Sequence, residues 1–243
     1  MRAAPGAGGR GRPQAAVIRT GCSGFSYAEW RGDFYPASLP PARMLAAYAE
    51  RLRAVELNNT FQRAPTESTL EGWVAKTPES FRFCPKAHRA LTYSAEAFPK
   101  EEVARNLHDR LFGLGSRLGP VLLQFPPTRK LDLDLLRRLL VALDLPAAAE
   151  FRDGSWFIEE TYRVLRQHGA ALCVTEGEKW PQAPFQDLAP FSYVRLRAAT
   201  YEGPALAPWQ ERLRELSRAH DEVYAFVRHG PDAPGIALSL SVD

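Results

Sequence analysis

Charged side chains interrupt several apolar runs of this sequence. Glu56 lies within the run Ala54–Leu57, Glu150 precedes Phe151 at the end of a second run, and Arg195 ends a third. Charged residues are almost never fully buried unless they are paired, so these side chains need partners. A carboxylate beside a guanidinium group stays ionised, which suits it to accept a proton. We therefore expect Glu56 and Glu150 to be catalytic bases.

Positive side chains outnumber carboxylates at the ends of the apolar runs. Guanidinium groups bind phosphate or carboxylate groups in bidentate geometry, and lysine adds a compact charge. This excess predicts an anionic, phosphate-bearing ligand. The charged residues predicted to bind it are Lys86, Arg89, Arg152, Arg195 and Arg228, with Arg197 and a third carboxylate, Glu176, on the same rim.

Uncharged polar and aromatic residues accompany these charges. Ser23, Asn58 and Gln124 end or follow apolar runs, and we expect their side chains to bind the same ligand. Aromatic side chains nearby can stack a base or a sugar, although they can equally pack over the core. The aromatic residues predicted to bind the ligand are Tyr27, Trp30 and Trp156.

Three other interpretations of these residues stay open. The charged side chains can form a structural ion-pair layer, since buried ionic networks are often only structural. Glu56, Glu150, Glu176 and His229 could hold Mg²⁺ or Mn²⁺, but so few ligands support a metal site weakly, and we predict none. The segment Gly21–Gly24 could form a turn whose backbone amides cradle an anion.

Short apolar runs alternate with longer amphipathic stretches along the chain. The runs predict strands, and apolar residues at a spacing of about 3.6 predict helices. Predicted strands cover residues 17–20, 54–57, 81–85, 121–125, 148–151, 171–174, 193–196 and 222–227. Predicted helices cover residues 41–53, 67–75, 101–118, 133–143, 159–167 and 209–219, and residues 235–243 form a short element at most.

Eight strands that alternate with helices indicate a parallel α/β sheet. Their number, in a chain of 243 residues, favours a single TIM-barrel-like (β/α)8 domain over residues 17–243, with an open doubly wound sheet as the alternative. Residues 1–16, rich in Gly, Ala, Arg and Pro, are expected to be a disordered tail. Barrel sites lie at the C-terminal ends of the strands, where the charged residues fall.

The overall composition excludes several classes of protein. With 45% hydrophobic and 24% charged residues, the chain is neither wholly disordered nor a small disulfide scaffold. The net charge of +3 arises in the first 19 residues, so it does not argue for a nucleic-acid binder. Three scattered cysteines and the lack of an apolar signal region fit a cytoplasmic protein, and no run long enough for a membrane span occurs.

Six blocks follow one another along the chain: TGCSGFSYAEWRGDFYP, VELNNTFQR, FRFCPKAHRALTY, LGPVLLQFPP, AEFRDGSWF and YVRLR. This ordered set resembles the domain of unknown function 72, also called the YecE-like family, from about Ile18 to about Tyr224. The resemblance implies a TIM-barrel-like fold and a shared pocket. It implies no reaction, because the activity of that family is not established.

The residues that match the family's motifs include most of the predicted site. Five positions at three sites depart from the family: Asp153 replaces a frequent His, Arg197 and Ala198 replace His and Gly, and Arg228 and His229 replace a pair of asparagines. Arg197 and Arg228 make part of the rim more positive. The matching residues are Gly24, Tyr27, Trp30, Phe34, Tyr35, Pro36, Glu56, Asn58, Thr60, Phe61, Arg63, Phe83, Lys86, Arg89, Gln124, Pro126, Glu150, Phe151, Arg152, Ser155, Trp156, Tyr193 and Arg195.

Three functions are compatible with these residues. The first is an enzyme, a metal-independent hydrolase or lyase, that acts on a phosphorylated or nucleotide-like substrate. The second is a nucleic-acid-binding or nuclease-like protein, whose arginines would contact the backbone while aromatic rings stack on bases. The third is a non-catalytic sensor of a small anion. We predict no cofactor and no membrane partner.

Overall fold

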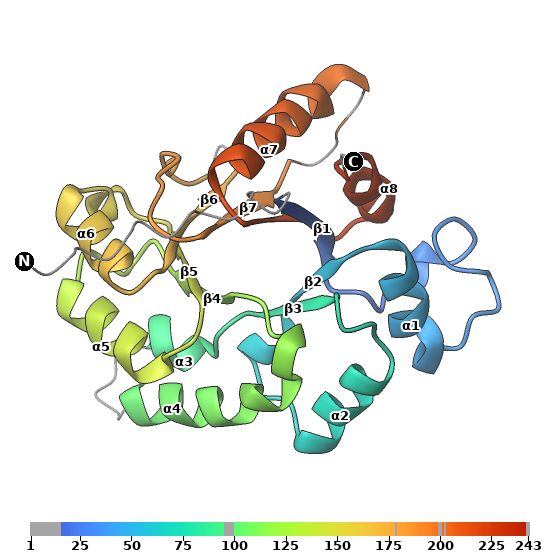
Figure 1. The fold of residues 1–243 in the computed structure, drawn as a ribbon, viewed down its shortest axis with the longest axis horizontal. Coiled ribbons are helices and arrows are strands. Elements are labelled where there is room, and N and C mark those ends of the chain that lie inside the picture. Colours follow the sequence, from blue (N-terminus) through green and yellow to red (C-terminus); the bar gives the residue numbers. More distant parts are fainter. Residues whose placement is uncertain (1–15, 95–99, 178, 199–200, 202, 242–243) are drawn as a thin grey trace, which may run out of the picture.

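The computed structural model describes residues 16–94, 100–177, 179–198, 201 and 203–241, so most of the predicted tail, residues 1–15, lies outside the described residues. Eight parallel strands stand at the centre, and helices surround them (Figure 1). The strands are β1 (Val17–Ser23), β2 (Ala54–Leu57), β3 (Arg82–Pro85), β4 (Val121–Phe125), β5 (Ala147–Phe151), β6 (Ala171–Thr175), β7 (Phe191–Leu196) and β8 (Glu222–Val227).

Helices follow most strands and cover the outside of the sheet. They are α1 (Pro41–Arg51), α2 (Glu67–Ala75), α3 (Arg89–Thr92), α4 (Lys100–Leu111), α5 (Leu133–Leu143), α6 (Glu159–Gln167), α7 (Ala207–Ala219) and α8 (Ala233–Ser239). No helix forms in the described residues between β6 and β7, where the sequence is rich in proline. None of the described helices combines the length and apolarity that a membrane crossing needs.

The strands form a barrel that is nearly closed. The hydrogen-bonded order is β3-β2-β1-β8-β7-β6-β5-β4, so β3 and β4 are the two edge strands. They lie next to each other where the barrel closes. There, isolated bridges join Phe83 to Leu118 and Lys86 to Leu122. The amide of Ala87 donates to the carbonyl of Leu122 at 3.0 Å across this seam. The TIM-barrel-like prediction is therefore confirmed, and the open doubly wound alternative is wrong.

Strand register brings the predicted site residues to one level. Ser23 pairs with Glu56 between β1 and β2, and Gln124 pairs with Glu150 between β4 and β5. Because paired residues in a parallel sheet face the same way, their side chains meet at the C-terminal end of the barrel. The register therefore gathers groups that are far apart in the sequence.

Two apolar layers hold this framework together. The outer layer lies between strands and helices, and the inner layer fills the barrel. Inside, Tyr193, Tyr224 and Phe226 from β7 and β8 belong to one buried cluster with small side chains such as Ala148 and Ala171 from the neighbouring strands β5 and β6. Large rings beside small residues help to fill the interior of a small barrel.

Three local features differ from the sequence analysis, for identifiable reasons. The predicted helix 101–118 ends at Leu111 and continues as a 3₁₀ helix over Phe112–Arg117, where Gly115 has a positive φ of 54°. The segment Gly21–Gly24, for which an anion-binding turn was one open interpretation, instead continues β1 to Ser23. Its amides are occupied, since that of Gly24 donates to the carbonyl of Glu56 at 2.8 Å. The short helix α3 was not predicted, because four residues give no periodic signal.

Candidate functional site

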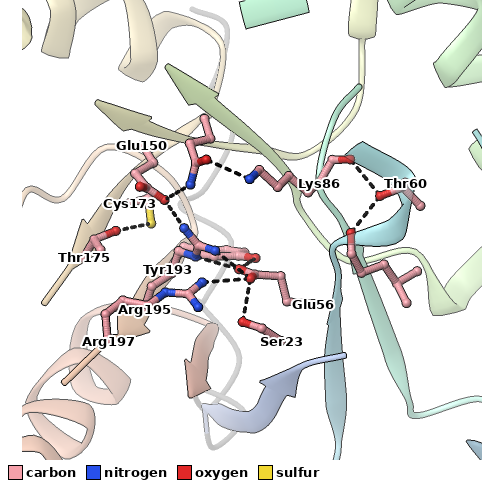
Figure 2. Close-up of polar contacts among 12 residues, drawn as sticks. Ser23, Glu56, Thr60, Lys86, Glu150, Cys173, Thr175, Tyr193, Arg195 and Arg197 are labelled. Carbon is pink, nitrogen blue, oxygen red and sulfur yellow. Dashed lines mark hydrogen bonds and ion pairs between the residues drawn. The ribbon is translucent and has the colours of Figure 1, made fainter. Parts of the chain in front are cut away.

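An ion pair joined by two hydrogen bonds lies at the centre of the barrel mouth. Arg195 donates from Nε to Oε2 of Glu56 and from Nη2 to Oε1, each at 2.8 Å. Arg195 is 3% exposed and Glu56 is fully buried. Two parallel hydrogen bonds between a guanidinium and a carboxylate fix both groups in one geometry. The pair joins β7 to β2 across the interior (Figure 2).

Arg195 also contacts the second buried carboxylate. Its Nη1 donates to Oε2 of Glu150, so the guanidinium lies between two carboxylates (Figure 2). Glu150 further accepts from Gln124 Nε2 at 2.9 Å and from Arg152 Nε at 2.8 Å. Burial alone would raise the pKa of Glu150, but the charges of Arg195 and Arg152 and the bond from Gln124 lower it to about 2.

Glu56 accepts three more hydrogen bonds. The donors are Ser23 Oγ at 2.8 Å, Tyr193 OH at 3.0 Å and Arg197 Nη2 at 3.0 Å. With the two bonds from Arg195, five donors therefore surround one carboxylate. The acceptor sites of the Glu56 carboxylate are therefore filled by donors from the protein. Glu56 needs no hydrogen bond from water or substrate.

Lys86 is a buried cation of the mouth with no carboxylate partner among the described residues. Its Nζ donates to Gln124 Oε1 at 2.7 Å and lies 3.8 Å from the centre of the Phe61 ring. No ion pair of Lys86 occurs within the described residues. Burial, together with the charge of Arg195, lowers the pKa of Lys86 to about 8. Tyr93 donates to the same oxygen of Gln124 at 2.8 Å.

These groups form the mouth cluster, which we define as Glu56, Lys86, Gln124, Glu150, Arg152, Arg195 and Arg197. When Lys86 is protonated, the cluster holds four positive and two negative side chains. Several donors are left over: Nη1 and Nη2 of Arg152 and Nε and Nη1 of Arg197 have no partner among the described residues. The cluster can therefore bind an anion without breaking its own bonds.

Aromatic rings flank the exposed side of the mouth cluster. The Arg152 guanidinium lies 5.1 Å from the Trp180 ring, which is partly exposed in the segment after β6. A hollow of about 230 Å³ lies beside the mouth, where β7 and β8 end and α8 begins. Arg228, His229 and Tyr201 are among the residues that line it.

The structure brings several predicted residues together and leaves others apart. Ser23, Glu56, Lys86, Gln124, Glu150, Arg152 and Arg195 are in direct contact with one another. Arg89 and Arg228 are exposed and have no bond to the mouth cluster. Asn58 is partly exposed next to the cluster, and its side chain makes no hydrogen bond within the described residues.

The predicted aromatic residues pack within the protein. Trp30 and Trp156 are fully buried, and their indole nitrogens donate to the carbonyls of Gly230 and Arg129, each at 2.8 Å. Tyr27 donates to the carbonyl of Ser23 at 2.7 Å, and its ring stacks on His229. These contacts correspond to the alternative interpretation, in which aromatic side chains pack over the core.

Glu176 and His229 lie apart from the two cluster carboxylates. Glu176 accepts from Trp209 Nε1 at 2.8 Å and from the hydroxyl of Tyr201, so it fixes the segment after β7. Within the described ranges, no three His, Cys, Asp or Glu side chains gather at distances suited to a metal ion. The oxygens of Glu56 and Glu150 are engaged by arginines instead.

Sequence reasoning missed two hydroxyl donors. Tyr193 lies two residues before Arg195 on β7 and shares its face, so strand alternation was a usable signal. Tyr93 follows the short helix α3, and its approach to Gln124 depends on a loop path that no sequence pattern encodes. Arg197 was placed on the rim, and the structure adds its bond to Glu56.

Comparison with known proteins matches this chain to one family. A model described as "Protein of unknown function DUF72" matches residues 19–242. The crystal structure of a DUF72 family protein from Thermotoga maritima MSB8 has 29% sequence identity and a TM-score of 0.81, and it covers 92% of this chain and 97% of that chain. A DUF72 family protein from Enterococcus faecalis V583, with 21% identity and a TM-score of 0.75, shows the fold alone.

A curated relative is similar over part of the chain. The UPF0759 protein YunF of Bacillus subtilis is 29% identical over 155 residues, which are 56% of this chain and 54% of that protein. The matched segment thus spans about half the length of the curated relative. None of these names states an activity. Since the family model covers nearly the whole barrel, the chain belongs to the DUF72 family, whose function is unknown.

Proposed function

We propose that the barrel mouth binds the phosphate group of a small anionic substrate and that the protein is an enzyme acting on that substrate. The excess of positive charge in the mouth cluster carries this proposal. Its two carboxylates are saturated by donors from within the protein, while its arginines keep unpartnered N–H groups. A purely structural ion-pair layer needs no such excess.

Arg152 and Arg197 are the residues that suit phosphate binding. Their side chains are 22% and 18% exposed, so solvent reaches them, while Arg195 beneath them is 3% exposed. Each is held at one nitrogen by a buried carboxylate, which orients the remaining nitrogens. A preoriented guanidinium loses less conformational entropy when it binds an oxyanion.

We assign proton transfer in this proposal to Lys86, although Glu56 and Glu150 are the bases expected from the sequence. Both carboxylates are buried, and their oxygens accept bonds from charged donors. An arginine does not lose its proton in proteins. Within the mouth cluster, Lys86 is the group whose pKa, about 8, lies near neutral pH.

Calorimetric titration with inorganic phosphate and with glycerol phosphate tests the binding step. We expect Arg152→Ala and Arg197→Ala each to weaken binding by about 10- to 100-fold, since a hydrogen bond to a charged group contributes about 1.5–3 kcal/mol. Arg163→Ala is the matched control, because Arg163 is exposed on α6 and outside the mouth cluster. Incubation with phosphorylated metabolites, followed by phosphorus NMR, tests for turnover.

The same experiments separate the alternatives. No binding of any phosphate compound by the wild-type protein, or equal weakening in Arg163→Ala, would contradict the proposal. Binding of oligonucleotides alone, falling steeply with salt, would favour the nucleic-acid function. Binding of a small anion that is never converted would favour the sensor.

A further inference from the structure

Lys86 occupies an unusual position among the positive groups of the mouth. It lies at the end of β3, 9% exposed, where Thr60 Oγ1 is 2.7 Å from the carbonyl oxygens of both Leu57 and Lys86. The Thr60 hydroxyl thereby fixes the backbone of Lys86. The Lys86 side chain passes over the Phe61 ring, and its Nζ donates to Gln124. Figure 2 shows Lys86 beside Thr60 at this edge of the mouth.

The surroundings of Lys86 favour a neutral amine more than those of an exposed lysine. Desolvation disfavours the charged form, and the nearby guanidinium of Arg195 adds repulsion. Glu56 and Glu150 favour the ammonium, but both are bound to arginines, and burial and the charge of Arg195 outweigh their effect on the pKa. A lysine that is desolvated or next to another cation is activated as a nucleophile.

We infer that Lys86 Nζ forms an imine with the aldehyde or ketone carbonyl of a phosphorylated substrate. This inference rests on the proposed function, because Arg152 and Arg197 would hold the phosphate while the carbonyl lies at Lys86. It narrows the substrate class from a phosphate-bearing molecule to a phosphorylated carbonyl compound. It also favours a lyase-type reaction over hydrolysis.

The step is balanced without a co-reactant. The lone pair of the neutral amine attacks the carbonyl carbon, a carbon–nitrogen bond forms, and the carbonyl oxygen becomes a hydroxyl. The first amine proton makes that hydroxyl, and the carbon–oxygen bond then breaks as the hydroxyl takes the second amine proton and leaves as water, which gives the imine. A protonated imine withdraws electrons from the neighbouring carbon, so that carbon can lose a proton or a carbon–carbon bond can break.

Gln124 is a positioning residue for this chemistry. Its Oε1 accepts from Nζ of Lys86, while its Nε2 donates to Glu150 at 2.9 Å, so the amide cannot flip without losing both bonds. Tyr93 donates to the same Oε1 at 2.8 Å. The amide therefore holds Nζ at the mouth, and the Phe61 ring covers one side of it.

Reductive trapping tests the inference. The wild-type protein is incubated with D-glyceraldehyde 3-phosphate, reduced with sodium borohydride, digested and analysed by mass spectrometry. Hydride addition to the imine carbon makes a stable secondary amine. At pH 7.5 we expect modification of Lys86 to exceed that of exposed lysines on the order of 100-fold, because an ordinary lysine with a pKa of about 10.4 is almost wholly protonated.

Two variants sharpen the experiment. Lys86→Arg keeps a positive charge but cannot form an imine, so trapping should disappear. Lys76→Arg is the matched control, because Lys76 is exposed at the end of α2 and makes no contact with the mouth cluster. Peptide mapping of the wild-type protein gives the answer even where Lys86→Arg fails to fold. The yield at Lys86 should rise as the pH increases through about 8.

The outcomes distinguish this inference from the proposed function. Absence of an adduct at Lys86, or adducts spread evenly over exposed lysines, would overturn the imine. If phosphate binding still depends on Arg152 and Arg197 in that case, the proposed function stands alone. If glyceraldehyde without phosphate labels Lys86 equally well, and Arg152→Ala changes neither yield, the imine is supported and the arginine site is not.

Discussion

The two ends of the barrel each contain an arginine–glutamate contact, and the two contacts differ in burial and in charge balance. At the N-terminal end, Arg19 donates from Nε to Glu222 at 2.7 Å and from Nη1 to the carbonyl of Ser80 at 2.6 Å. Tyr224 donates to the other oxygen of Glu222 at 2.5 Å. One positive charge thus meets one negative charge, and both are satisfied within the protein.

The C-terminal mouth breaks that balance. There, Arg195 alone joins two carboxylates, and Arg152, Arg197 and Lys86 add further positive charge. A larger hollow, about 810 Å³, lies at the N-terminal end and is lined in part by Glu222 and Tyr224. The size of a hollow therefore does not identify the site in this protein. Our proposed anion site therefore rests on the surplus of charge in the mouth cluster and on its arginine donors that have no partner in the described residues.

The largest expected effect comes from removing the guanidinium that each end depends on. Arg195→Leu removes the buried guanidinium that Glu56 and Glu150 share and leaves each carboxylate with one partly exposed arginine, Arg197 or Arg152. We expect it to lower the free energy of unfolding by about 3–5 kcal/mol. Arg19→Leu should lower it by about 1–2 kcal/mol, because Glu222 keeps the bond from Tyr224 and its side chain is 30% exposed. Urea denaturation of both variants measures the difference.

Equal losses in the two variants would contradict the comparison. A second substitution that restores stability to the Arg195→Leu variant tests the cause of its instability directly. If the buried carboxylates are responsible, Glu150→Gln in the same chain should recover part of the lost free energy of unfolding, because one buried charge is removed. No recovery would mean that lost packing causes the instability.

The next effect concerns acid stability. The folded pKa of Glu150, about 2, lies below the ordinary value of 4.5, so the folded state holds the ionised carboxylate more strongly than the unfolded state. This contribution is fully present above about pH 4.5 and is lost as the pH falls towards 2. We expect it to be on the order of 3 kcal/mol. Urea denaturation of wild type and Glu150→Gln between pH 6 and pH 2 should show a steeper loss in the wild type.

The fold was largely predictable because the residues that end helices and strands agree with the apolar periodicity along the chain. The boundaries of β2, β4 and β8 match the prediction, since glycine, proline or charged residues bound each apolar run. The meeting of Glu56 with Arg195 followed from barrel geometry, which brings strand ends together. Where the helix predicted over residues 101–118 breaks, a single glycine in a positive-φ conformation decides the outcome.

The donor pattern of the site was not predictable from the sequence. Strand alternation places Glu56 and Glu150 at the mouth, but only interatomic distances reveal that charged donors already occupy their oxygens. Loops contribute Tyr93 and Trp180, whose paths depend on tertiary packing. The sequence does not distinguish a Trp30 that stacks on a ligand from one that fills the core. In the structure Trp30 is fully buried, so its ring packs in the core.

The smallest expected effect comes from a positive residue at the mouth that is outside the cluster. Arg228 follows β8, is exposed, and lines the hollow of about 230 Å³ without an ion pair in the described part of the chain. We expect Arg228→Ala to change the free energy of unfolding by less than about 0.5 kcal/mol. Phosphate affinity should fall no more than about threefold, and this difference should vanish at high salt, because screening removes exposed charge effects. A loss as large as that in Arg152→Ala, measured by the same titration, would move the anion site from the mouth cluster to the hollow beside β8.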